Sequence, residues 1–194
     1  MERGIKFHCI WKKTNAFPMA RVAKLNALRK DLYARGLIFA DSKGVGHGNA
    51  SLRIGKGFLI TASGTGTRRT LTGKHFALVD RVDIPNNTVW CQGPAEASSE
   101  SMTHHAVYRA SPSTKAVIHV HAPAVWKKWI GKLPTTSRKA RYGTPELAKE
   151  VLRLFRKGTV RKTKMFVLGG HKPGLIVFGR TVGEAEQVLL QYVH

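Results

Sequence analysis

One stretch constrains the fold of this chain more than any other: residues 95–123, where a helix pattern runs into a strand that ends on His-x-His. Side chains on a strand alternate between its two faces. His119 and His121 therefore point the same way, and Ile118 and Val120 point to the opposite face. The stretch predicts a rigid strand that carries two neighbouring imidazoles on one side and apolar side chains on the other.

The rest of the chain alternates short strand patterns with helix patterns, and it contains no internal repeat and no linker composition. Helix patterns begin at Pro18, at Thr144-Pro145, where Thr is the N-cap, and at the capping box Thr181-x-x-Glu184. Residues 1–17 are expected to form an irregular basic extension. Strand patterns cover residues 37–40, 52–54, 57–62, 78–82, 88–91, 164–168 and 175–178. Short strands with helices at both ends predict one layered α/β or α+β domain over residues 1–194.

Composition limits the class of protein. The 194 residues are enough for one domain with a real core, and the apolar share of 42% is ordinary for a globular protein. Cys9 and Cys91 do not make a disulfide framework, so a reducing cytoplasm is the expected location. Because no apolar run approaches the roughly 18 residues of a spanning helix, we expect no membrane partner.

The net charge of +22 is the most unusual bulk property of the chain. A field of this sign attracts phosphates, nucleic acid and anionic membrane surfaces. It favours either a nucleic-acid binder or an enzyme with an anionic substrate, and it is equally typical of a solvated basic surface. Charge alone does not separate these interpretations.

The paired histidines suit a divalent transition metal, because imidazole nitrogen is a good ligand for zinc and its neighbours. The same spacing is also typical of two exposed or hydrogen-bonded histidines. His171 follows two glycines and could complete a set of three. Glu100 could be a general base or a metal-linked carboxylate, or simply a charge in the first turn of a helix.

Three turns have the composition of anion-binding loops, in which glycine lets backbone N–H groups approach a phosphate. They are Gly48-Asn49-Ala50-Ser51, Ser63-Gly64 and Ser98-Ser99, the last at a predicted helix start. Each could also be an ordinary turn. His104 is interpreted as a packing residue behind the site. The remaining histidines have no partner pattern and are interpreted as surface or structural residues: His8, His47, His75, His105 and His194.

Taken in order, these pieces resemble the class II aldolase and adducin-head family. That family includes fuculose-phosphate and rhamnulose-phosphate aldolases, ribulose-phosphate 4-epimerase and methylthioribulose-phosphate dehydratase. The segments that carry the resemblance span most of the chain from about residue 20 onward. They are G-N-A-S (48–51), L-I-T-A-S-G (59–64), S-S-E-S-M-T-H-H-A-V-Y-R (98–109), A-V-I-H-V-H-A-P (116–123), G-T-P-E-L-A (143–148) and G-G-H-K-P-G-L-I-V-F-G (169–179).

The resemblance implies an α/β fold, a three-layer α/β/α sandwich around a mainly antiparallel central sheet, in a homotetramer with active sites between subunits. It implies that His119, His121 and His171 bind Zn2+ or another divalent transition metal such as Mn2+, Co2+ or Fe2+. Glu100 would be the catalytic acid/base. The substrate phosphate would be held by Asn49, Ser63, Gly64, Ser98 and Ser99.

The activity that the resemblance implies is that of a metal-dependent lyase, an aldolase acting on a small phosphorylated ketose in carbohydrate metabolism. One alternative is a 4-epimerase or dehydratase acting on a pentulose phosphate, since those relatives keep the same metal set. Another class is a non-catalytic anion- or nucleic-acid-binding protein on the same scaffold, as the adducin head is. Nucleic acid is not favoured, because none of the stacking-aromatic motifs of common RNA modules is present.

The chain departs from the family pattern in two places. Lys172 and Pro173 stand between His171 and the glycine that directly follows it in relatives. The loop after His121 looks shorter and is rich in lysine and arginine, and no tyrosine there matches the proton donor that the aldolases take from a neighbouring subunit. Tyr142 aligns with a different position. The predicted metal ligands and phosphate-binding residues therefore match the family. The loop after His121, which supplies the tyrosine proton donor in the aldolases, differs.

Overall fold

A large mixed sheet runs through the computed structural model, which describes residues 6–193. Its eight strands have the order β1-β7-β6-β5-β4-β8-β10-β9, and neighbours are antiparallel except for the parallel pair β1 and β7. The strands are β1 (His8–Lys13), β4 (Asn49–Ile54), β5 (Gly57–Thr61), β6 (Phe76–Asp83), β7 (Thr88–Gly93), β8 (Ala116–His121), β9 (Met165–Val167) and β10 (Gly174–Gly179). This confirms a mainly antiparallel central sheet.

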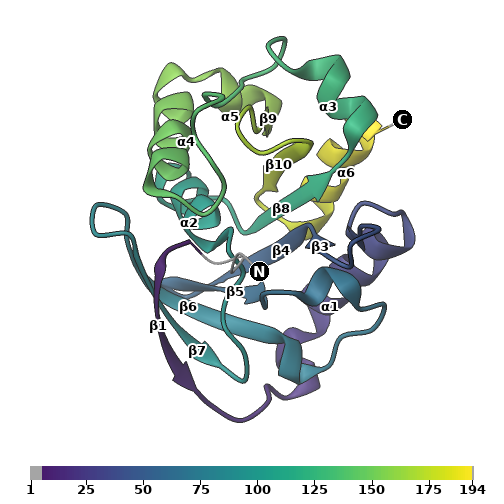
Figure 1. Cartoon of the computed structure of the whole chain (residues 1–194), viewed down its shortest axis with the longest axis vertical. Helices are drawn as coiled ribbons and strands as arrows, with labels where there is room; N and C mark the ends of the chain where they lie inside the picture. The colour runs from purple at the N-terminus through teal and green to yellow at the C-terminus, as the bar shows by residue number, and fades with distance from the viewer. Residues whose placement is uncertain (1–5, 194) are drawn as a thin grey trace.

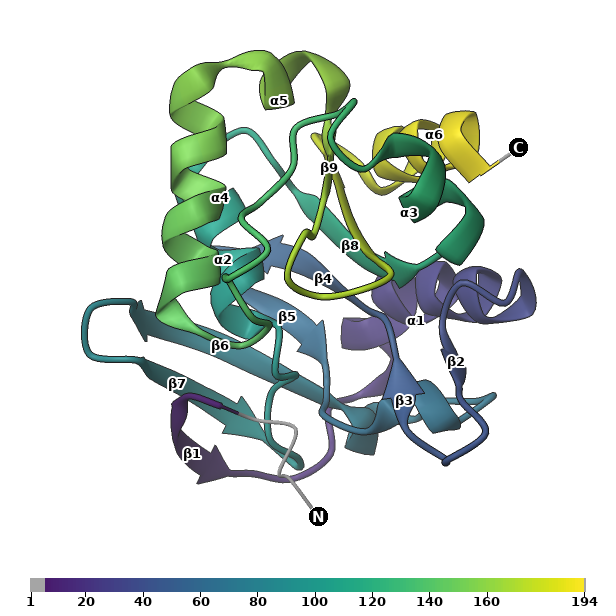
Figure 2. The ribbon, with the colours of Figure 1, turned by 45° about the horizontal axis from the view of Figure 1, so that its top comes forward.

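Helices cover both faces of the sheet, so the molecule has three layers (Figure 1). Figure 2 shows α2 and α4 on one side of β4, β5 and β8, and α1, α3 and α6 on the other. The helices are α1 (Met19–Ala34), α2 (Ser101–Ala110), α3 (Pro123–Trp129), α4 (Pro145–Lys157), α5 (Thr159–Thr163) and α6 (Val182–Val193). The predicted α/β/α sandwich is therefore confirmed. Among the described residues, no helix is long and apolar enough to cross a membrane.

Two apolar cores fill the spaces between the layers, and strand β8 separates them. Ile118 and Val120 face the core under α1, α3 and α6, whereas Val117 faces the core under α2 and α4. His119 and His121 lie on the same face as Val117, as the alternation of strand side chains predicts. Both histidines are buried, so the sheet places them inside the molecule.

Helix boundaries follow local signals closely. Thr144 caps α4 by accepting a hydrogen bond from the Leu147 amide, and Gly158, with φ of 84°, ends it. Thr181 caps α6 through the Glu184 amide. Helix α2 begins at Ser101, with Glu100 at its N-cap position, slightly later than the predicted start. The short helix α5 directly after Gly158 was not predicted.

The expected irregular extension over residues 1–17 is wrong for residues 8–13, which form strand β1. This strand pairs with the free edge of β7, and the Trp11 indole nitrogen donates to the Gly93 carbonyl at 2.9 Å. Backbone pairing to an open sheet edge satisfies N–H and C=O groups regardless of side-chain pattern. The strand was therefore not predicted from this basic sequence. Residues 1–5 and His194 lie outside the described part of the chain.

Two further short strands, β2 (Phe39–Ala40) and β3 (Gly46–His47), form a separate hairpin beside the main sheet. The Asp41 carboxylate organises its turn by accepting hydrogen bonds from the backbone amides of Lys43 and Val45, each at 2.9 Å. This hairpin leads directly into Gly48 and β4. It therefore brings the first glycine-rich turn to the strand next to the histidines.

Candidate metal and substrate site

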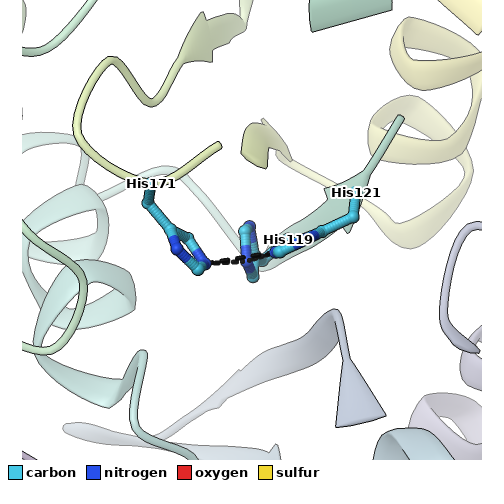
Figure 3. Close-up of side chains that lie close together, drawn as sticks. All are labelled: His119, His121 and His171. Atoms are coloured by element: carbon cyan, nitrogen blue, oxygen red, sulfur yellow. Dashed lines mark hydrogen bonds between the residues drawn. The ribbon is translucent and has the colours of Figure 1, made fainter. Parts of the chain in front are cut away.

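Three histidines from two distant parts of the chain converge on one point (Figure 3). His119 and His121 lie on β8, and His171 lies in the turn between β9 and β10. Their Nε2 atoms form a nearly equilateral triangle: 3.1 Å from His121 to His119, 3.1 Å from His121 to His171, and 3.2 Å from His119 to His171. The structure thus brings together the three predicted metal ligands.

The turn that carries His171 accommodates the two inserted residues. Gly174 donates its amide to the His171 carbonyl at 2.7 Å, which closes the turn over Lys172 and Pro173. A Cβ atom on Gly174 would stand 2.9 Å from the His119 ring, so glycine is required for this close approach. The extra residues bulge outward and leave the histidine directed inward.

The triangle of nitrogens has the geometry of a cation site. The Leu175 carbonyl, 3.1 Å from His119 Nδ1, can only accept, so Nδ1 carries the hydrogen and Nε2 of His119 presents a lone pair. Ligands about 2.0–2.1 Å from one ion lie roughly 2.9–3.4 Å apart, which matches the three observed separations. Three imidazole nitrogens suit zinc, cobalt, manganese or iron, so these residues fit a divalent transition metal.

Burial keeps all three imidazoles neutral, the form that binds metal. It lowers the pKa of His121 to about 3 and that of His171 to about 4, and it holds the pKa of His119 well below its usual value. Neighbouring imidazoles act in the same direction, because one charged ring disfavours charging the next. At neutral pH, protons therefore do not compete for the three Nε2 atoms.

Glu100 faces this triangle from the start of α2. Its side chain is 2% exposed, and neither carboxylate oxygen has a hydrogen-bond partner of good geometry among the described residues, although the nearby Thr103 hydroxyl acts to lower the pKa of this carboxyl. Oε1 lies 3.7 Å from Nε2 of His171, too far for a hydrogen bond. Burial raises the pKa of this carboxyl to about 7. A buried carboxylate without donors is costly, and a cation held by the histidines would supply the missing positive charge.

The five predicted phosphate ligands line the same cavity as the histidines and Glu100, a hollow of about 360 Å³. They are Asn49, Ser63, Gly64, Ser98 and Ser99. Asn49 is the register partner of His119 on the adjacent strand, and its buried Oδ1 atom has no hydrogen-bond partner in the described chain. We call the three histidines the histidine half of this cavity, and the five small polar residues the cradle half, or cradle. The roles of these residues stay predictions.

Glycine is required where the loop before Asn49 meets the loop after Gly64, and we call these two segments the cradle loops. A Cβ atom on Gly46 would lie 2.9 Å from the Gly66 Cα atom, so the two loops meet backbone to backbone. Gly48 has φ of 82°, and a Cβ there would stand 2.8 Å from the Ile38 side chain. Residues of both loops line the cavity, and glycine-rich loops of this kind are suited to binding an anion.

A buried arginine on α1 fastens one cradle loop. The guanidinium of Arg29 donates to the carbonyl oxygens of Arg69, at 2.8 Å, and Thr65, at 2.9 Å, and also to that of Arg68. Its side chain is 1% exposed, and burial lowers its pKa. The charged side chain is therefore used inside the protein, where its hydrogen bonds hold three backbone carbonyls of this loop to α1.

Two further titratable side chains line the cavity that sequence patterns did not place there, His47 and Tyr142. His47, interpreted from the sequence as a surface or structural residue, makes a structural contact in the β2–β3 hairpin and also lines the cavity. Its ring centroid lies 4.6 Å from that of His121, and its Nε2 atom bonds the Asp41 carboxylate at 2.9 Å. The Tyr142 ring packs 4.8 Å from that of His171. The signal for His47 was its place in the glycine-rich turn, directly before Gly48.

His104 stays outside the triangle of ligands. It is buried on α2, and its Nδ1 atom is 2.7 Å from the Ser51 hydroxyl, which also contacts the Tyr108 hydroxyl at 2.8 Å. Burial lowers the pKa of His104 to about 3, so it is neutral. It packs behind the cavity and ties α2 to β4, in agreement with its interpretation as a packing residue.

Comparison with known proteins gives a consistent picture. Residues 25–126, more than half of the chain, match the family of class II aldolase and adducin N-terminal domains. A curated 5-methylthioribulose-1-phosphate/5-deoxyribulose-1-phosphate aldolase from Rhodospirillum rubrum is 29% identical over 160 residues, which cover 74% of this chain and 66% of that protein. The matched part is slightly less than two thirds of that relative's length.

Solved structures share the fold. The crystal structure of L-fuculose-1-phosphate aldolase from Thermus thermophilus superposes with a TM-score of 0.65 at 26% identity, covering 90% of each chain. A sugar-phosphate aldolase from Thermotoga maritima superposes with a TM-score of 0.62, covering 88% of this chain and 90% of its own. At 18% identity, the second comparison shows the fold alone.

Proposed function

Because this chain belongs to the class II aldolase and adducin N-terminal domain family, we propose that it is a metal-dependent lyase that breaks or forms a carbon–carbon bond in a small phosphorylated ketose. The observation that carries the proposal is the convergence of three histidine Nε2 atoms within 3.2 Å of one another, faced by the unpartnered carboxylate of Glu100. Buried polar groups are normally satisfied, so such a cluster points to a bound cation and a substrate.

His119, His121 and His171 would hold the ion, zinc or another divalent transition metal such as Mn2+, Co2+ or Fe2+. When bound, it supplies Lewis acidity, which lowers the energy of negative charge on a substrate oxygen. The β8 strand and the hydrogen bond from His119 Nδ1 to the Leu175 carbonyl orient the ligand set. The protein therefore needs no large rearrangement to bind the ion.

Glu100 would move the proton at the substrate carbon beside the carbonyl group. In condensation its carboxylate removes that proton, and in cleavage it returns the proton after the carbon–carbon bond has broken. Its place in the cavity wall, with Oε1 3.7 Å from Nε2 of His171, supports this role, since the reacting carbons must lie beside the bound ion. The 2% exposed side chain keeps water from competing for the proton.

The cradle would bind the substrate phosphate through the backbone and side chains of Asn49, Ser63, Gly64, Ser98 and Ser99. The cavity of about 360 Å³ supports a small substrate. Aldol cleavage also needs a second proton carrier at the oxygen of the departing aldehyde. His47 and Tyr142 line the cavity and can carry a proton, so we assign this step to one of them.

The 5-methylthioribulose-1-phosphate/5-deoxyribulose-1-phosphate aldolase from Rhodospirillum rubrum supports these two ketose phosphates as first substrates to test. We propose that the enzyme works as a homotetramer with sites between subunits. Val45, at the cavity rim, is 51% exposed, and a large apolar side chain in that place supports a contact with a second copy. Mass measurement of the native protein tests the assembly.

The reaction is tested with purified full-length protein that has been stripped with a chelator and reloaded with zinc, cobalt, manganese or iron. A panel of phosphorylated ketoses is supplied, and the release of aldehyde and of dihydroxyacetone phosphate is measured. We expect cleavage of at least one ketose 1-phosphate that requires added metal. An epimerised or dehydrated product without aldehyde would assign the chain to the epimerase or dehydratase chemistry instead. Absence of any product with all four metals contradicts catalysis.

A further inference from the structure

Positive charge is concentrated in one part of the chain. Residues 127–172 hold fourteen of the 33 lysines and arginines but only two of the 11 acidic residues, Glu146 and Glu150. This quarter of the sequence therefore carries +12 of the net charge of +22. Figures 1 and 2 place its helices α3, α4 and α5 together at one end of the molecule, away from β1 and β7.

The densest cluster lies where α4 turns into α5. Four exposed cations occupy seven consecutive residues around Gly158, and we call them the basic corner: Arg156, Lys157, Arg161 and Lys162. None of the four forms an ion pair with a described residue, whereas Arg153 one turn earlier is paired with Glu150 at 2.7 Å. Four unpaired like charges repel one another, so the folded protein gains nothing from their proximity.

Packing fixes the corner instead of leaving it as a flexible tail. The apolar side of α4, including Val151 and Phe155, is buried under the sheet, which directs the polar side outward. The guanidinium of Arg161 lies over the Phe155 ring at 5.3 Å, so the start of α5 is held against α4. The charges therefore form a preorganised surface.

A small hollow of about 160 Å³ continues this surface. Arg161, Lys164 and Arg180 line it together with the hydroxyl residues Ser111, Ser113 and Thr114. Glu184 is also there, paired with Lys164 and within 3.7 Å of Arg180, so it balances part of the charge. Cations and hydroxyl groups around a hollow of this size match a phosphate group.

The hollow and the metal site lie at opposite ends of the same strand pair. Gly174 of β10 pairs with His121 of β8, whereas Gly179, which lines the hollow, pairs with Ala116. Five residues of strand separate the two ends, or about 17 Å. The basic corner therefore does not contact a substrate held at the histidines, and its ligand is a different molecule.

We propose that the basic corner and its hollow bind the sugar–phosphate backbone of nucleic acid, independently of base sequence. A phosphate polymer matches a row of unpaired cations with one phosphate-sized hollow, because each cation can neutralise one phosphate. An anionic membrane fits less well. The large apolar residues exposed among those described are Ile10, Met19, Val45 and Ile54, and none lies in residues 127–172 to insert into lipid.

The test uses fluorescence anisotropy of labelled RNA, single-stranded DNA and duplex DNA of about 20 nucleotides, titrated with the full-length protein between about 50 and 200 mM KCl. The corner variant carries Arg156→Gln, Lys157→Gln, Arg161→Gln and Lys162→Gln. The control variant carries Lys12→Gln, Lys13→Gln, Lys24→Gln and Lys30→Gln, four exposed cations on β1 and α1. Both variants have a net charge of +18, four below the parent value of +22.

We expect the affinity of the parent protein to fall steeply with salt. At 100 mM salt the corner variant should bind at least about 50-fold more weakly than the parent, whereas the control should lose less than about fivefold. Tighter binding of RNA than DNA, or the reverse, would identify the natural strand and support the proposal in either case. Aldolase activity should be unchanged in both variants, because neither contains a residue of the metal or cradle site.

Three results would overturn the proposal. Equal losses in the two variants would show a diffuse charge effect. Negligible binding by the parent at the lowest salt would remove the activity itself. Vesicles containing phosphatidylserine that bind as tightly as nucleic acid, with the same dependence on the corner, would assign it to membranes. If the fourfold corner variant unfolds, Lys157→Gln with Lys162→Gln keeps the contact between Arg161 and Phe155 and is predicted to lose at least about fivefold.

Discussion

The two halves of the cavity are built by different means. Two of the three histidines stand on β8, which is hydrogen-bonded to β4 on one side and β10 on the other, and the third lies in the turn that leads into β10. The cradle half is made of loops apart from Asn49 at the start of β4, and two of these loops are held by the contact of Gly46 with Gly66 and by the buried guanidinium of Arg29. Chemistry is therefore fixed by the sheet, while anion binding depends on how the loops close. Substitutions in the histidine half should therefore lower metal binding and the catalytic rate, whereas substitutions in the cradle half should raise KM.

The largest effect is expected from removing one metal ligand in the histidine half. His171→Ala should lower activity by at least about 10³-fold, since Lewis acidity is worth several kcal/mol and each 1.4 kcal/mol is tenfold in rate. The turn of His171 lies outside the strands, so the fold should persist, as measured by circular dichroism and thermal melting. The matched control is Lys172→Ala, an exposed neighbour in the same turn. A fully active His171→Ala variant would separate the triangle from catalysis.

Glu100→Gln should lower kcat by about 10²- to 10³-fold, because the amide cannot carry the proton. The side chain keeps its shape and loses its charge, so metal should still bind at the histidines and KM should change little. Steady-state kinetics with metal analysis of the same sample distinguishes the two effects. A variant that lost metal and activity together would show that the carboxylate acts mainly through the ion.

Arg29→Met should act on the cradle half instead. It removes the guanidinium that donates to the carbonyls of Thr65 and Arg69 and leaves Thr65 with the Arg68 amide alone, which should cost about 2 kcal/mol of unfolding free energy. Because the loop also presents the anion-binding backbone, KM should rise roughly tenfold while the metal content stays the same. Arg21→Met, an exposed position on the same helix, is the control and should change neither value. An unchanged KM would mean that the loop binds the substrate phosphate without the hydrogen bonds from Arg29.

The smallest expected effect on catalysis comes from His104, which does not line the cavity and acts instead on the pH dependence of stability. Burial depresses the pKa of His104 to about 3 in the folded protein, against about 6.5 in the unfolded chain. A depressed folded-state pKa gives stability that is complete above pH 6.5 and is lost as pH falls from 6.5 towards 3, because the unfolded chain binds the proton first. Urea unfolding of metal-free protein should therefore weaken over this range, and His104→Gln should flatten the slope. An identical slope in the variant would assign the pH dependence to other groups.

Sequence patterns were sufficient for the two histidines of β8 and insufficient for contacts between distant loops. The two-residue period of a strand placed His119 and His121 on one face without reference to any other part of the chain. His171 came from its glycine-rich turn and from resemblance, since no local period reports which loops meet. The Asp41–His47 pair was missed because its partners face each other only across the β2–β3 hairpin.

The same distinction explains the errors in the fold. Helix α4 was predicted correctly because its cap, its apolar face and its final glycine are local signals. Strand β1 was not, because its pairing depends on an open edge of β7 more than 70 residues away. Arg29 looks like a surface cation on a helix, and only the loop that closes over it reveals that it is buried.

The most direct test of the central claim is metal analysis of protein purified without chelator, combined with X-ray absorption of the bound ion. We expect about one divalent ion per chain with three imidazole nitrogen ligands at about 2.0–2.1 Å, lost in His171→Ala and retained in Lys172→Ala. Protein that binds no ion after incubation with zinc, or that binds one equally well without His171, would contradict the account.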